Sequence, residues 1–162
     1  MNATMTSRER VARVLNHEKP DRLVVDLGGM HCSGAHVSVI YELRQALGLD
    51  APGTPVKVRD IYQMAGDVEL DLIRALELDI ALIPSRTTMF GFPKCDWKPW
   101  TTFEGTPVLV PGLFNADSDE NGDILQYPQG DRTLPPSGRM PNGGFYHDAI
   151  MRQAPINDDR LN

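Results

Sequence analysis

Two short apolar runs constrain the possible folds of this chain more than any other feature of its sequence. They are Arg22–Leu27 and Asp79–Pro84, and helical patterns occupy most of the sequence between them. Continuous apolar character over about six residues is typical of a strand buried on both faces, as in a parallel sheet. The order of strand, helices and strand indicates a right-handed parallel crossover and an α/β fold.

Three helical patterns accompany these runs. Thr6 and Glu9 have the spacing of a capping box, which predicts a helix that ends before Pro20. Apolar residues recur at helical spacing over 36–47 and again over 60–78. We therefore expect one helix before the first strand and two helical regions between the strands.

The chain changes character after Pro84. It contains 14 glycines and 13 prolines, and 17 of these residues lie within 84–144. Such a composition favours turns over helices. Glu104–Gly105 and Asn121–Gly122 are the expected turns of two β-hairpins, over 101–110 and 113–127.

These patterns divide the chain into three parts. We expect an N-terminal helix with the first βα units, a Gly/Pro-rich β-hairpin insertion, and the start of a next segment. The three parts are 1–84, 85–144 and 145–162.

Charge and hydropathy exclude several classes of partner. The sequence has 16 Lys and Arg against 22 Asp and Glu, a net charge of −6 that disfavours non-specific binding to nucleic acid. It has no apolar run of about 18 residues and no apolar signal-peptide core, so we expect no membrane partner and a cytoplasmic protein. Two cysteines are too few for a disulfide scaffold.

Two groups of residues resemble metal sites incompletely. The acidic loop 117–122 matches the start of a calcium loop, but Pro128 stands where the bidentate Glu is needed, which favours a solvated turn. Four zinc-type ligands have spacings that match no compact zinc motif, which favours a buried thiol and a loop histidine. These four are His31, Cys32, His36 and Cys95.

The glycine-containing loop GGMHCSGA, residues 28–35, connects the first expected strand to a helix. Backbone donors at such a junction can face an anion. The loop lacks the G-x-G-x-x-G pattern of dinucleotide-binding proteins. A loop that faces a ligand and a loop that only makes a tight turn both remain open on this pattern.

Four segments in order resemble the N-terminal part of the uroporphyrinogen decarboxylase superfamily. They read TSRERVARVLNHEKPDRLVVDLGG, SGAH, PVKVRDIYQMAGDVELDLIRALELDIALI and RMPNGGFYHDAIMRQAPI. The resemblance covers essentially the whole chain. It is closer to the branch grouped with cobalamin-dependent methyltransferases than to the decarboxylases of haem synthesis.

The resemblance implies the N-terminal portion of a (βα)8 (TIM) barrel, with about two barrel strands and a β-hairpin-rich insertion. Active sites of such barrels lie at the C-terminal ends of the strands. The loops after the two expected strands would therefore bind substrate or cofactor, and Arg86 is the natural partner for an anion. The residues concerned are Gly28, Gly29, His31, Ser33, Gly34, Ser85 and Arg86.

The resemblance also implies a corrinoid cofactor, with a small molecule or a corrinoid protein as substrate. Methyltransferases of this kind hold zinc through ligands in the C-terminal half of the barrel, which would lie beyond Asn162, so we assign no metal ligand here. Decarboxylases carry an arginine-rich glycine loop and a Ser-Asp pair where this chain has 28–35 and 84–86. This difference disfavours decarboxylation, so a decarboxylase of tetrapyrrole synthesis is the second alternative.

Length supports a third alternative. A TIM barrel typically needs about 250 residues, whereas this chain has 162. We therefore expect the chain to be an incomplete enzyme that is inactive alone. A non-catalytic fragment or binding module, which self-associates through exposed apolar faces, is the remaining interpretation.

Overall fold

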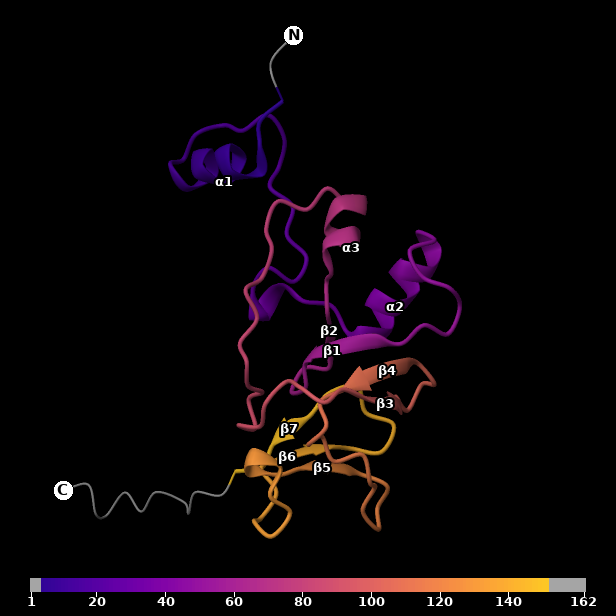
Figure 1. The fold of residues 1–162 in the computed structure, drawn as a ribbon. Helices are drawn as coiled ribbons and strands as arrows, with labels where there is room; N and C mark the ends of the chain where they lie inside the picture. Colours follow the sequence, from indigo (N-terminus) through magenta and orange to yellow (C-terminus); the bar gives the residue numbers. More distant parts are fainter. Residues whose placement is uncertain (1–3, 152–162) are drawn as a thin grey trace, which may run out of the picture.

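A computed structural model describes residues 4–151 and shows a mixed α/β arrangement (Figure 1). Within that range the chain forms three α-helices, a four-stranded sheet and a three-stranded sheet. None of these helices is long and apolar enough to cross a membrane. The expectation of an α/β fold is confirmed at this level.

Helix α1 (Ser7–Leu15) begins where the capping box predicts it. The Thr6 amide donates to Glu9 Oε2 at 2.8 Å, and the Glu9 amide donates to the Thr6 hydroxyl at 3.3 Å. These two bonds satisfy backbone donors that the first turn of a helix leaves free. In Figure 1 the helix lies apart from both sheets.

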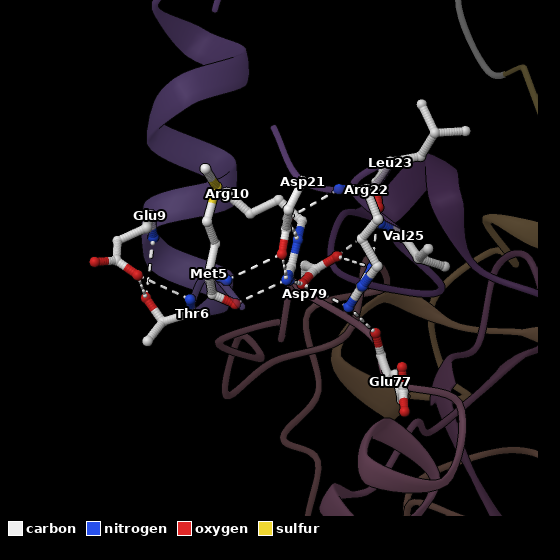
Figure 2. Close-up of polar contacts among 10 residues, drawn as sticks. All are labelled: Met5, Thr6, Glu9, Arg10, Asp21, Arg22, Leu23, Val25, Glu77 and Asp79. Carbon is white, nitrogen blue, oxygen red and sulfur yellow. Dashed lines mark hydrogen bonds and ion pairs between the residues drawn. The ribbon is translucent and has the colours of Figure 1, made fainter. Parts of the chain in front are cut away.

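A buried ion network ties α1 to the rest of the molecule (Figure 2). Arg10 donates Nη1 to Asp79 Oδ1 at 2.5 Å and Nε to Asp21 Oδ1 at 2.7 Å. Arg22 donates Nη1 to Asp79 Oδ2 at 2.7 Å, and the Val25 amide donates to the same oxygen at 3.0 Å. The Asp79 carboxylate therefore joins the helix to two segments that are distant in sequence.

The predicted helix over 60–78 is wrong. Strands β1 (Val56–Asp60) and β2 (Ala65–Gly66) form an antiparallel pair at its start, and only α3 (Leu70–Ala75) is helical. The alternating sequence VKVR in β1 buries both of its valines in the core. This period of two favours a strand over 56–59, and the pairing of β2 with that strand replaces the first part of the expected helix.

Helix α2 (Val37–Ala46) confirms the helix predicted over 36–47. His36 caps its start, because His36 Nδ1 accepts from the Ser38 amide at 3.3 Å. Ile40 is fully buried, and a β-carbon added at Gly66 would lie 2.8 Å from it. The absence of a side chain at Gly66 therefore lets the helix pack closely on β2.

The larger sheet has the order β2-β1-β4-β3. Strands β3 (Lys98–Thr101) and β4 (Pro107–Val110) are antiparallel and confirm the hairpin around Glu104–Gly105. Gly105 has φ +91°, a conformation that glycine adopts readily. Strand β4 pairs in parallel with β1, so the hairpin region extends the sheet of the N-terminal region.

The smaller sheet has the order β5-β6-β7, formed by Ile124–Gln126, Gly138–Met140 and Asp148–Ala149. The turn expected at Asn121–Gly122 is present, because the Gly122 amide donates to the Asp119 carbonyl oxygen at 3.0 Å. The strand before this turn contributes only an isolated bridge between Ser118 and Ile124. Strand β5 pairs instead with β6, so the hairpin over 113–127 is confirmed only at its turn.

Aromatic and aliphatic side chains from both sheets form one core. Phe114 lies against Trp100 with ring centroids 5.1 Å apart, and Phe90 stacks on Phe92 at 6.4 Å. Met140 from β6 is buried in the same cluster. The core therefore joins the Gly/Pro-rich region to β1 and β4.

The expected strands 22–27 and 79–84 are extended segments, and the structure assigns no strand to either. They lie side by side, because the Asp79 amide donates to the Val25 carbonyl oxygen at 2.9 Å. In Figure 1 both run away from α1. Leu23 is 83% exposed and Ile83 is 93% exposed, so these segments lack the neighbours that a buried ladder requires.

Candidate functional site

The loop 28–34 closes on itself through backbone contacts. The Gly28 amide donates to the Ser33 carbonyl oxygen at 2.9 Å, and the Met30 amide donates to Ser33 Oγ at 3.0 Å. A short 3₁₀ helix, His31–Ser33, forms within the loop. Gly28 has φ +79°, which a residue with a side chain adopts at a cost. The loop is thus a tight turn that its own backbone and Ser33 hold closed.

A buried arginine lies beneath this loop. Arg59 is 5% exposed, and its Nη1 donates to the Gly28 carbonyl oxygen. A β-carbon added at Gly34 would lie 2.7 Å from Arg59 Nη2, and one added at Gly28 would lie 3.2 Å from Nη1. These two glycines therefore leave the space that the Arg59 guanidinium fills.

Two of the polar atoms of Arg59 have no hydrogen-bond partner. Nε and Nη2 are both buried and unpaired. No carboxylate of residues 4–151 forms an ion pair with Arg59, although other buried arginines, such as Arg10 and Arg44, each contact two aspartates. A buried charge without a partner costs free energy. The position of Arg59 is thus unlike that of a structural arginine.

Arg59 lines two adjoining cavities of about 480 and 560 Å³. Asp67 and Pro84 also line both of them. The 480 Å³ cavity brings together the loop after the second extended segment and charged side chains from β1 and from the insertion. Its other lining residues include Lys57, Ser85, Arg86, Lys94, Cys95 and Trp97.

A third cavity, of about 380 Å³, contains His31 and Ser85. His31 Nδ1 lies 3.7 Å from Asp60 Oδ2, and Lys94 Nζ donates to Ser85 Oγ at 3.2 Å. Burial lowers the pKa of Lys94, and the nearby Arg59 lowers it further, whereas Asp60 opposes the shift. Lys94 lines this cavity and the 480 Å³ cavity, so the two share a cationic wall.

The structure brings together four of the seven residues expected to bind substrate or cofactor. Gly28, His31, Ser85 and Arg86 line these three cavities. The others shape the loop instead. The Gly29 amide donates to Asp26 Oδ1 at 2.7 Å, Ser33 closes the turn, and Gly34 packs on Arg59.

Sequence reasoning missed Arg59 and Lys94. The signal for Arg59 was present, because alternation in VKVR places Lys57 and Arg59 on the same face of a strand, opposite the two valines. The structure puts both cations on the wall of the 480 Å³ cavity. No comparable signal marks Lys94, which reaches the site through the loop that precedes β3.

The four residues considered as zinc-type ligands do not converge. Cys32 and Cys95 are free and both are exposed, so the expectation of a buried thiol is wrong. His36 Nε2 lies 2.9 Å from the Phe145 carbonyl oxygen. Residues 4–151 contain no group of three or more His, Cys, Asp or Glu side chains placed to hold a metal ion. In the acidic loop, Asp119 Oδ1 accepts from the amides of Asn121 and Asp123 at 2.9 Å, as in a hydrogen-bonded turn.

Comparisons with known proteins add no relative to this description. No protein-family model, no curated protein and no solved structure matches the chain significantly.

Proposed function

We propose that the chain is the N-terminal part of a uroporphyrinogen decarboxylase-superfamily barrel, most similar to the cobalamin-dependent methyltransferases. One observation carries the proposal. The extended segments 22–27 and 79–84 run side by side, and the loops that follow them line the three cavities. The 380 and 480 Å³ cavities share Lys94, and the 480 and 560 Å³ cavities share Arg59. In a TIM barrel the loops after parallel strands form the active site.

The exposed apolar side chains of both segments support the same proposal. Leu23, Val25 and Ile83 are 83%, 42% and 93% exposed, although aliphatic runs of this kind are typical of fully buried strands. Further parallel strands beside them would bury these side chains. Two extended segments with exposed aliphatic side chains are what the first two units of a barrel would present before the other six pack against them.

The donors around the cavities fit a ligand rich in acceptor oxygens, such as a corrinoid or another tetrapyrrole. Arg59 offers two unpaired N–H groups, and Arg86 lines the same cavity. A bound methylcorrinoid would supply the methyl group. The residues of this chain would orient the ligand and exclude water, and the His31 imidazole lies 3.7 Å from the Asp60 carboxylate.

The test uses the protein encoded by the complete reading frame that contains this chain. We expect methyl transfer from methylcobalamin to a thiol, and we expect His31→Ala and Arg86→Ala each to lower its rate. His17→Ala and Arg8→Ala, which alter exposed residues at α1, are matched controls. Unchanged rates in both loop variants would remove His31 and Arg86 from the site.

Two further results separate the alternatives. Release of carbon dioxide from uroporphyrinogen, without methyl transfer, would assign the decarboxylase activity. A reading frame that contains no further strand–helix units after codon 162 would contradict the barrel and favour the binding module.

A further inference from the structure

We infer that the 480 Å³ cavity at Arg59 is a binding site for a small oxyanion, a phosphate or carboxylate group. This inference rests on the buried guanidinium and its surroundings, and it stands whether or not the protein transfers methyl groups. No carboxylate of the described chain occupies the place of a counter-ion for Arg59. An exogenous anion would supply that counter-ion.

The chemistry of Arg59 defines the ligand class. The guanidinium is planar and always charged, and it pairs with carboxylate or phosphate oxygens through two parallel N–H donors. Here only Nη1 is used, by the Gly28 carbonyl oxygen, while Nε and Nη2 are free. These two adjacent donors have the fork geometry that a bidentate oxyanion accepts.

The loop 28–34 keeps the guanidinium available. Gly28 and Gly34 lack the β-carbons that would collide with it, and a single hydrogen bond retains it beneath the loop. The side chain already forms part of the cavity wall. Binding requires the outer torsions of Arg59 to rotate so that the two free donors face an anion in the cavity, where new charge-assisted bonds replace the bond to Gly28.

The other charged residues of the cavity favour an anion over a cation. Lys57, Arg86 and Lys94 line it with Arg59, and Asp67 is the acidic residue among its lining side chains. Lys57 Nζ lies 5.9 Å from the Trp97 ring centroid and 3.9 Å from Glu69 Oε1, which is half-exposed. Burial is the main cause that lowers the pKa of Lys94, and Arg59 adds a smaller repulsion that Asp60 and Asp67 oppose; an oxyanion beside the two cations would favour the charge of both.

Thermal denaturation of the 162-residue chain tests the site. Inorganic phosphate and acetate are titrated separately, with sodium chloride at matched ionic strength as the control. At ten times Kd, linkage predicts a rise of about 3–6 °C in Tm for a chain of this size. A response to phosphate alone assigns a phosphate ligand, and a response to acetate alone assigns a carboxylate. No response beyond that of chloride overturns the inference.

Variants locate the site. Arg59→Met keeps the volume and removes the charge, so we expect its Tm without anion to equal or exceed that of the wild type. We also expect it to weaken anion binding roughly 10- to 100-fold. A merely structural arginine would give the opposite pattern, a lower Tm with unchanged anion affinity.

Two further variants keep the inference testable if Arg59→Met does not fold. Arg86→Gln and Lys94→Gln change side chains at the cavity wall and are expected to fold and to bind the anion several-fold more weakly. Arg8→Gln makes the same charge change on α1, outside the cavity lining. Equal weakening in all three would indicate a general charge effect and would overturn the site.

Discussion

His147 is a side chain whose protonation the fold opposes. It is 1% exposed, its ring meets those of Phe90 and Phe114 at steep angles, and its Nδ1 donates to the Ile61 carbonyl oxygen at 2.8 Å. Burial lowers its pKa to about 4 from 6.5, although the bond to Ile61 and the charge of Asp148 oppose the shift. The neutral imidazole is therefore the form that the core accepts.

This shift predicts a specific loss of stability in acid. The unfolded chain binds a proton at this histidine below about pH 6.5, whereas the folded protein binds it only near pH 4. The neutral His147 therefore contributes about 3 kcal/mol to the free energy of unfolding above pH 6.5, and this contribution is lost as the pH falls to 4. Urea denaturation across this range should show a shallower pH dependence for His147→Gln. Parallel curves for the two proteins would contradict the assignment.

The elements show which sequence signals decide structure. Helix α1 was predictable from its capping box, Thr6 with Glu9, and α2 from the helical spacing of its apolar residues. The structure of the segment 60–78 was not predictable. Its apolar residues have helical spacing, whereas β2 is defined by its contacts with β1 and α2. Tertiary pairing of this kind leaves no local signal.

The same limit applies to the candidate site. The glycines of the loop 28–34 were recognisable as a junction between elements, and four of the seven expected residues line the cavities. Arg59 was not recognised because it lies just before the expected helix over 60–78. It was therefore expected in a connecting loop, with no strand face and no neighbouring strand. Lys94 reaches the site only through the packing of the insertion.

The attachment of α1 gives a prediction at the scale of one element. Burial raises the pKa of Asp79, but hydrogen bonds from the Val25 amide and the Arg10 and Arg22 guanidiniums outweigh burial and lower it to about 2 from 3.8. The stabilisation is therefore complete above about pH 4 and is lost as the pH falls toward 2.

Asp79→Asn should detach α1 at neutral pH. We expect its amides to exchange hydrogen at least about tenfold faster, because local opening of the helix becomes easier, while the β4 amides keep their protection. Glu18→Gln, which removes an exposed carboxylate beside the same helix, is the matched control. Equal protection of α1 in wild type and Asp79→Asn would show that the ion network does not anchor the helix.

At the scale of the whole molecule, the core and the extended segments have opposite characters. The two sheets enclose a core of aromatic and aliphatic side chains, whereas the segments 22–27 and 79–84 expose aliphatic side chains. Extended edges of this kind pair readily with other chains. The chain thus combines a folded body with one unpartnered face.

This face predicts self-association of the 162-residue chain, through pairing of the extended segments of two copies. Sedimentation should show a molecular mass that rises with protein concentration. Leu23→Lys combined with Ile83→Lys should keep the chain monomeric, because charged side chains on both edges oppose pairing. Leu113→Lys with Leu134→Lys places the same charges on exposed leucines of the insertion and should leave the association intact. A wild-type chain that stays monomeric at every concentration, with a cooperative melt, would show that the two segments need no neighbour, and it would remove the support that their exposure gives to the barrel proposal.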